Sequence, residues 1–188
     1  MAKIISVTGS ASGAGKSTLA WGLAKELKAA VIQLDKYETF TSLPPHVAQE
    51  WLRRGALADE FPAPGYAEAI AQAHTSNATY AIVDGHLGRT HRSTAPMVDF
   101  MIYLDVPMDI ALARCLRRQL RNLNTPPTAK LGMLEGHIDS YLAWVRGAYA
   151  LQHARLPPLA DLILDANQPV ETLLRQALAA IALRFNDT

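Results

Sequence analysis

Short apolar runs alternate along this chain with longer segments of helical periodicity. Five of the short runs are predicted as strands: Lys3 to Thr8, Ala30 to Leu34, Tyr80 to Val83, Phe100 to Leu104 and Asp161 to Leu164. Strands that are apolar along nearly their whole length are typical of a parallel sheet covered on both faces. The pattern therefore favours strands that form the middle layer of an α/β protein.

The segments between these runs carry apolar residues three or four positions apart. Leu19, Leu23 and Leu27, for example, recur at every fourth position, which places them on one face of a helix. The same reasoning predicts helices over residues 17–28, 45–54, 65–74, 107–121, 134–153 and 169–185. Strands that alternate with helices predict an α/β fold with helices on both faces of the sheet.

Composition narrows the classes of function. The chain has 188 residues, enough for a single domain, and its net charge is +1, from 18 Lys and Arg against 17 Asp and Glu. This balance gives no electrostatic reason to expect a nucleic-acid partner. The one cysteine, Cys115, excludes a disulfide framework, and no apolar run is long enough for a membrane span. The N-terminus leads into glycines and not into a signal-peptide cleavage site, so we expect a cytoplasmic protein.

A glycine-rich turn follows the first predicted strand and precedes the first predicted helix. Its second half, Gly13-Ala14-Gly15-Lys16-Ser17-Thr18, has the spacing of a phosphate-binding loop (P-loop). Backbone N–H groups there would hold phosphates, with Lys16 reaching the β- and γ-phosphates and Ser17 ligating Mg²⁺. The usual first glycine falls at Ser10, and Gly9 comes one residue early. Either Ser10 is tolerated at this position, or the loop is one residue longer.

Acidic residues follow two more strands. Asp35 could take a proton from an acceptor hydroxyl, and Asp84 could hold Mg²⁺ directly or through water. We expect both near the P-loop, because ligands of open α/β sheets gather at the carboxyl ends of the strands. The loop after Asp84 carries Arg89, His91 and Arg92, which either bind an anionic or polyhydroxyl acceptor or form a solvated polar loop.

Arginines line one face of the predicted helix over residues 107–121. Arg114, Arg117, Arg118 and Arg121 are three or four positions apart, and Pro126-Pro127 follow soon after the helix. An arginine face that leads into a breakable loop is typical of a lid that closes over nucleotide phosphates. A solvated helix face is the alternative. We expect Arg114 and Arg118 to contact phosphates.

Several segments together resemble the uridine kinase-like branch of the P-loop nucleoside kinases. They are the P-loop, Asp35-x-Tyr37, Asp84-Gly85, residues 100–105 followed by 109–114, and residues 160–164. The resemblance implies a three-layer α/β/α sandwich on a five-stranded parallel sheet and ATP with Mg²⁺ as donor. It also implies that Asp35 is the base, that a lid lies around residues 114–132, and that the 165–169 loop lies near the adenine.

The chain departs from that family at three places. The P-loop entrance is irregular, and Asp84 stands where these kinases often have Glu. Residues 41–76, which we expect to form a substrate-side helical insertion, lack the uridine-specific pattern. Tyr37 and Trp51 in or near this region could stack on a base or pack in the core.

The sequence as a whole favours a kinase that phosphorylates a hydroxyl of a nucleoside or similar small metabolite, with Lys16, Asp35, Arg114 and Arg118 as catalytic residues. A nucleotide-dependent regulatory ATPase that acts on a protein partner is the alternative. Against it, we find neither a clear water-positioning Gln or Thr nor a guanine-reading Asn-Lys-x-Asp motif. Oligomeric state cannot be deduced from the sequence.

Overall fold

Five parallel strands form one sheet in the order β2-β3-β1-β4-β5. A computed structural model describes residues 1–122 and 126–186 of the chain. The strands are β1 (Lys3–Thr8), β2 (Ala30–Gln33), β3 (Tyr80–Asp84), β4 (Phe100–Asp105) and β5 (Leu162–Asp165). The predicted five-stranded parallel sheet is therefore confirmed, and each strand end lies within one residue of the expected position.

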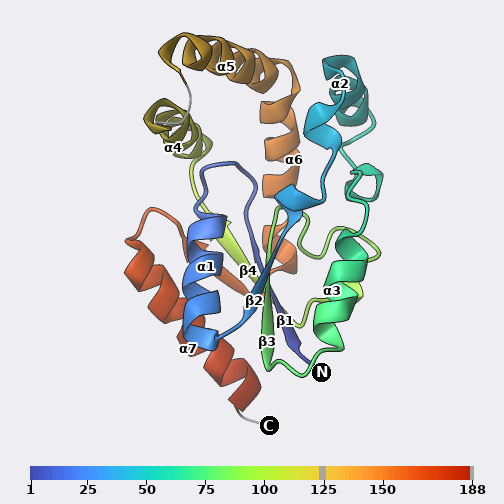
Figure 1. Cartoon of the computed structure of the whole chain (residues 1–188), viewed down its shortest axis with the longest axis vertical. Helices are drawn as coiled ribbons and strands as arrows, with labels where there is room; N and C mark the ends of the chain where they lie inside the picture. The colour runs from blue at the N-terminus through green and yellow to red at the C-terminus, as the bar shows by residue number, and fades with distance from the viewer. Residues whose placement is uncertain (123–125, 187–188) are drawn as a thin grey trace.

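Helices cover both faces of the sheet, as the alternation of elements predicts (Figure 1). On one face, α1 (Lys16–Leu27) and α7 (Val170–Asn186) share an apolar cluster with Ile5 and Val7 of β1. On the other face, α3 (Tyr66–His74) and α6 (Arg146–Arg155) share a second cluster with Ile4. Successive strand residues point to opposite faces, so a strand buried on both sides is apolar at almost every position.

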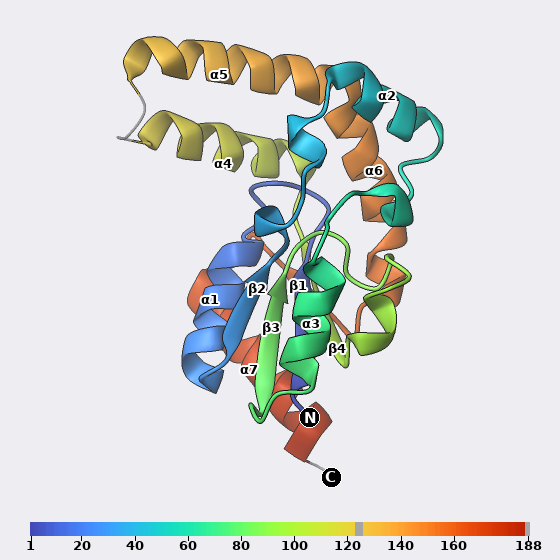
Figure 2. The same cartoon turned by 45° about the vertical axis from the view of Figure 1, so that its right-hand side comes forward.

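Three further helices lie beyond the carboxyl ends of the strands (Figure 2). They are α2 (Pro45–Arg53), α4 (Met108–Arg121) and α5 (Pro127–Ser140). Short 3-10 turns connect the larger elements: Leu34–Lys36, Phe40–Ser42, Ala58–Glu60, Ala95–Met97 and Pro157–Leu159. Helices α4 and α5 run side by side as a hairpin over the P-loop side of the sheet. This α4–α5 hairpin includes residues 114–132, the region that we expect to act as the lid, although residues 123–125 of it lie outside the described residues.

The predicted helix over residues 134–153 differs from the observed structure. A π-helical turn at Tyr141–Val145 separates α5 from α6, and the helix axis changes direction there (Figure 2). An extra residue in the turn of a helix is a known cause of sharp bends. Because of this bend, α6 packs on the sheet while α5 extends over α4. In residues 1–122 and 126–186, no helix is both long and apolar enough to cross a membrane.

Candidate nucleotide and acceptor site

The P-loop connects β1 to α1 and curls through two glycines in the left-handed region. Gly13 has φ +92° and Gly15 has φ +96°, and α1 begins directly after Gly15. A Cβ on Gly13 would lie 2.1 Å from the carbonyl oxygen of Ala111, on the first turn of α4. Only glycine fits there, because both the backbone conformation and the close approach of α4 exclude a side chain.

The irregular entrance of the loop is accommodated by a buried hydrogen bond. Ser10 is 1% exposed, and its Oγ accepts a hydrogen bond of 3.2 Å from the hydroxyl of Tyr103 on β4. The same Tyr103 hydroxyl lies 3.0 Å from Nδ1 of His153 on α6. A serine can thus occupy the position usually held by glycine, because its polar atom has a partner in the body of the protein.

Lys16 lies between the P-loop and two carboxylates. Its ammonium group donates a hydrogen bond of 2.8 Å to the carbonyl oxygen of Ala11. Burial lowers the pKa of Lys16, and the negative charges of Asp84 and Asp35 act in the opposite direction. Asp84 is buried at the end of β3, whereas Asp35 is exposed in the turn after β2. The fold therefore brings together the lysine and both acids that the sequence singles out.

Lys16, Asp35 and Asp84 line one cavity of about 520 Å³. Its phosphate side is lined by Ser10, Ala11, Ser12, Gly13, Gly15, Lys16, Ser17 and Thr18. Ala14, which we expect in the nucleotide site, is buried and contributes its backbone to the loop, with its N–H donating to Ala11 O. Outside the P-loop, the lining residues include Asp35, Glu38, Phe40, Thr41, Trp51, Phe61, Asp84, His86 and Trp144. The cavity is thus large enough for an acceptor beside a phosphate chain.

Aromatic side chains from four segments form one wall of this cavity. The ring of Phe40 lies 4.7 Å from Trp51, 4.9 Å from Phe61 and 5.6 Å from Trp144, centroid to centroid. Trp51 is 3% exposed and donates its indole N–H to the carbonyl oxygen of Leu57. Of the two roles open to Trp51, base stacking and core packing, the structure shows core packing, at the edge of the cavity.

His86 completes the wall, with its ring edge-on to Phe61 at a centroid distance of 4.8 Å. Burial, together with the positive charge of Lys16, lowers the pKa of His86 to about 3. The imidazole is therefore neutral at physiological pH and can both donate and accept a hydrogen bond. The sequence pattern did not identify Glu38, Phe40, Phe61, His86 or Trp144 as lining residues, because only tertiary contacts bring them together.

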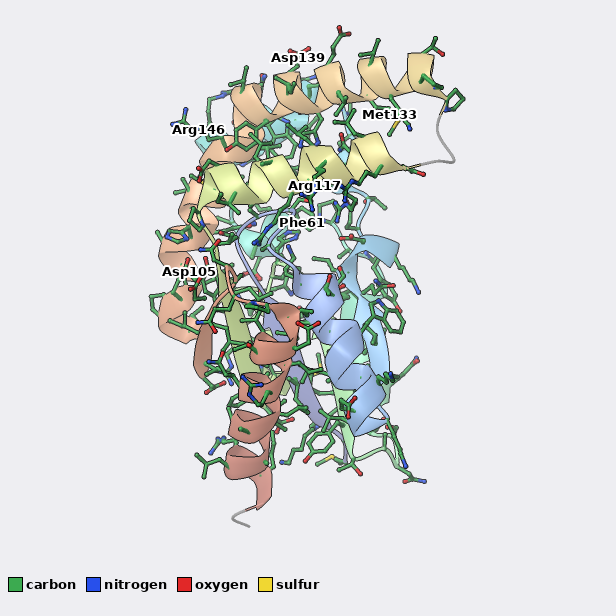
Figure 3. The ribbon with its side chains drawn as sticks, turned by 90° about the vertical axis from the view of Figure 1, so that its left-hand side faces the viewer. Phe61, Asp105, Arg117, Met133, Asp139 and Arg146 are labelled. Atoms are coloured by element: carbon green, nitrogen blue, oxygen red, sulfur yellow. The ribbon has the colours of Figure 1, made fainter. Side chains whose placement is uncertain are left out.

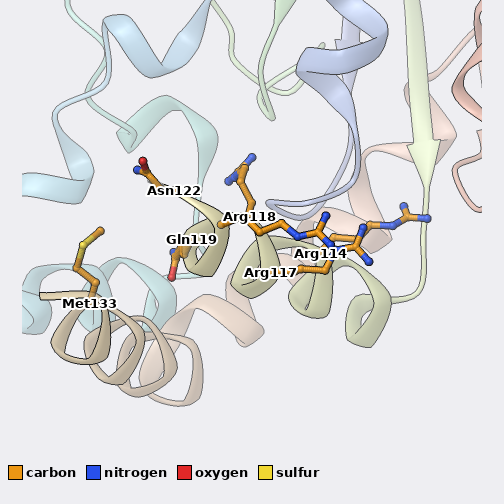
Figure 4. A pocket seen from close by; sticks show the side chains of 7 residues that line it. Arg114, Arg117, Arg118, Gln119, Asn122 and Met133 are labelled. Carbon is orange, nitrogen blue, oxygen red and sulfur yellow. The ribbon is translucent and has the colours of Figure 1, made fainter. Parts of the chain in front are cut away.

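Arginines of α4 line a second cavity of about 650 Å³ between α4 and α5 (Figure 4). Figure 3 shows the two helices from the side, with Arg117 on α4 and Met133 on α5. Arg118 also reaches the P-loop, where it donates a hydrogen bond of 3.2 Å to Oγ of Ser12. Arg114 donates to the carbonyl oxygen of Ala166, in the loop between β5 and α7. The expected arginine face thus exists, but its members have different partners.

Four residues that we expect at the acceptor do not line the cavity that contains Lys16. Arg89 forms an ion pair of 2.7 Å with Asp161 and donates to the carbonyl oxygens of Val98 and Leu159. Its guanidinium group therefore joins the loop after β3 to the segments that precede β4 and β5.

The other three residues also have neighbours outside that cavity. The guanidinium of Arg92 pairs with Asp59 at 3.5 Å, and His91 is partly buried within the same loop. Tyr37 packs against Tyr66 at a centroid distance of 5.7 Å. The residues at the ends of β2 and β3, such as Asp35 and Asp84, line the cavity, whereas these four residues lie farther along the loops and have partners elsewhere.

The residues at the cavity suit a magnesium nucleotide. Mg²⁺ is usually held by one or two protein oxygens together with phosphate oxygens and water. Ser17 and Asp84 offer a hydroxyl and a buried carboxylate on the same cavity. Across residues 1–122 and 126–186, no group of three or more His, Cys, Asp or Glu side chains could hold a metal on its own. Ser17 and Asp84 are the residues at this cavity that could hold such an ion.

Comparisons with known proteins give matches in structure only. No family model and no curated protein sequence matches the chain. Among solved structures, a sugar kinase from Janibacter sp. HTCC2649 has a TM-score of 0.57 and 22% identity, covering 96% of this chain and 95% of that one. A gluconokinase from Sinorhizobium meliloti 1021 has a TM-score of 0.55 and 18% identity, with 99% and 94% covered.

A deoxyadenosine kinase from M. mycoides with bound dATP is similar over 95% of this chain and 98% of its own. Its TM-score is 0.55 and its identity 15%. The likeness covers nearly the whole length of each protein, so it concerns the complete architecture and not one motif. The chain therefore has the fold of the P-loop kinases, with a five-stranded parallel sheet between two layers of helices.

Proposed function

We propose that this protein is an ATP- and Mg²⁺-dependent kinase that transfers the γ-phosphoryl group to a hydroxyl of a small molecule. One observation carries the proposal: Lys16, Ser17, Asp35 and Asp84 line a single cavity that continues past the P-loop to an aromatic wall. The kinases with the same fold support it, since their names give a sugar, gluconate or a deoxynucleoside as acceptor.

Each residue has a role that follows from its position. The N–H groups of the P-loop and the ammonium of Lys16 would bind the phosphate chain and stabilise charge that develops on the transferred group. Ser17 and Asp84 would hold Mg²⁺, which when bound shields the charge of the phosphates. Asp35, exposed at the cavity, would orient the acceptor hydroxyl and accept its proton at a carboxylate oxygen.

The lid arginines act from the other side. Arg118 is held next to the P-loop by Ser12 and is placed to neutralise charge on the phosphates. Arg114, hydrogen-bonded to Ala166, would support the loop of residues 165–169, where the resemblance to uridine kinase-like proteins suggests the adenine. Within this class, a nucleoside or similar ribose-bearing metabolite remains the acceptor that we favour.

The test is release of ADP by the purified protein with Mg²⁺ and ATP, alone and with nucleosides, sugars and other hydroxylated metabolites. We expect one acceptor to raise the rate well above the acceptor-free rate. Asp35→Asn should then reduce transfer by roughly 10²–10⁴-fold, the range of general base catalysis, and leave ATP affinity unchanged. The control Asp139→Asn, on the exposed part of α5, should behave like the wild type.

A regulatory ATPase would give a different result. Its rate would be steady without an acceptor, no compound would change it, and Asp35→Asn would have little effect. That outcome would refute the kinase proposal and turn the search to protein partners.

A further inference from the structure

The charged groups of the main cavity are divided between its two sides. The cations that line it, Lys16 and Arg118, are both hydrogen-bonded to the P-loop, to Ala11 and Ser12 respectively. Beyond the P-loop the lining carries three carboxylates: Asp35 and Glu38, which we assign to the acceptor side, and Asp84, the proposed Mg²⁺ ligand. An acceptor that enters beside the phosphates therefore meets negative charge on the protein, and no arginine or lysine lines that side within the described residues.

The carboxylate of Glu38 at this side has a hydrogen-bond partner for each of its oxygens. Thr41 donates two hydrogen bonds to its carboxylate, one from the hydroxyl at 2.7 Å and one from the backbone N–H at 3.1 Å. The two bonds use one lone pair on each oxygen, so each oxygen can still accept a further hydrogen bond. A preorganised carboxylate at a binding cavity is suited to an N–H or O–H donor of the ligand.

The remaining wall is apolar or neutral. The aromatic cluster of Phe40, Trp51, Phe61 and Trp144 contributes planar side chains, and the ring of His86 lies edge-on to Phe61. Such a wall favours a ring over a flexible chain, because flat apolar surfaces pack well against one another. Apart from Lys16 and Arg118 at the P-loop, no lysine or arginine among the described residues lines this cavity, so a carboxylate or phosphate on the acceptor would meet no further cation there.

We propose that the acceptor is a ring-bearing hydroxyl compound without negative charge, and that Glu38 selects it by accepting a hydrogen bond from one of its N–H or O–H groups. This inference rests on the proposed kinase function and deepens it. Like charges placed together across an interface are strongly unfavourable, so Glu38 and Asp35 would exclude acids of the same shape. Thr41 acts as a positioning residue for Glu38.

Binding can be measured without turnover. A library of hydroxylated ring compounds, divided evenly between anionic and non-anionic members, would be screened by ligand-observed NMR against the protein saturated with Mg²⁺ and ADP. Matched pairs such as shikimate and its methyl ester would be included. We expect the binders to be at least tenfold enriched in non-anionic compounds. A hit list with as many acids as neutral compounds would overturn the inference, and so would an empty one.

Variants then test Glu38 itself. Glu38→Gln keeps the shape and can still accept a hydrogen bond from Thr41, but it removes the charge. It should reduce the ratio of affinities for the neutral and anionic member of a matched pair by about tenfold, with Glu26→Gln on the exposed side of α1 as control. An unchanged ratio would refute the role of Glu38. Thr41→Val should weaken binding of the neutral member and be rescued in part by Thr41→Ser.

Failure of this inference is separable from failure of the kinase proposal. Nucleotide affinity and acceptor-dependent release of ADP test the kinase. The charge preference of the bound compounds tests only the acceptor side of the cavity. If the protein phosphorylates an acid, the kinase proposal stands and the proposal of an acceptor without negative charge is refuted.

Discussion

Arg118 on α4 donates a hydrogen bond to Oγ of Ser12 in the P-loop, across 106 positions of sequence. The same guanidinium nitrogen lies 3.8 Å from Sγ of Cys115, one turn earlier in the helix. The contact ties the α4–α5 hairpin to the loop that would bind phosphates. The site is therefore built from two segments that are adjacent only in the folded protein.

Replacing Arg118 tests this arrangement. Arg118→Ala should lower kcat on the order of 10²-fold, because a charge at the phosphates is lost, while stability should change little for an exposed side chain. Steady-state kinetics and urea unfolding would measure both. The control is Arg117→Ala, which removes an arginine of the neighbouring cavity that does not line the P-loop cavity. Equal losses in the two variants would contradict a specific role for Arg118.

Stability should fall on acidification because of His86. Its pKa is about 3 in the folded protein and near 6.5 when unfolded, so the unfolded state binds more protons between these values. The contribution of His86 to the free energy of unfolding should therefore be constant above pH 7 and decrease by up to roughly 1.4 kcal/mol per pH unit below 6.5.

The variant His86→Gln isolates that contribution. Urea unfolding from pH 5 to pH 8 should give a smaller decrease for His86→Gln than for the wild type. His46→Gln, at an exposed position of α2, should follow the wild type. If His86→Gln and the wild type have parallel pH profiles, the imidazole is not held neutral by the fold.

Substitutions of the buried, hydrogen-bonded residues Ser10 and Tyr103 should have non-additive effects on the free energy of unfolding. Tyr103→Phe leaves Oγ of Ser10 without its partner, which should cost about 1–2 kcal/mol of unfolding free energy. Ser10→Ala removes the orphaned hydroxyl, so the double variant should be less destabilised than the sum of the single variants. A double-mutant cycle by chemical denaturation measures the coupling. Strict additivity would mean that the hydrogen bond does not stabilise the P-loop entrance.

Two glycines should respond in opposite ways to alanine. Gly13→Ala combines a positive φ with a contact of 2.1 Å to Ala111 O, and should destabilise the protein by several kcal/mol or prevent nucleotide binding. Gly132→Ala on α5 meets no atom within 4 Å and should stabilise that helix by about 0.5–1 kcal/mol. Thermal unfolding with and without ATP would check both. A harmless Gly13→Ala would contradict the close approach of α4.

The order of strands and helices was predictable from the sequence because it depends on local information. A strand buried on both faces, such as β1, must be apolar at nearly every position, and α1 must repeat its leucines with the period of a helix. The phosphate-binding conformation expected for Gly13 to Ser17 also depends on local sequence, since it needs only a glycine-rich turn between such a strand and such a helix. These features fixed the fold class and one half of the candidate site.

The acceptor part of the candidate site was decided by tertiary structure alone. Nothing in local periodicity separates the bend at Tyr141–Val145 from a straight helix, yet this bend brings Trp144 beside Phe40. Likewise, no sequence pattern shows that Arg89 pairs with Asp161 or that Arg118 reaches Ser12. The spacing of apolar residues along the sequence indicates whether a side chain is buried. Which distant residue a side chain meets depends on how whole elements pack, and that packing formed the acceptor wall.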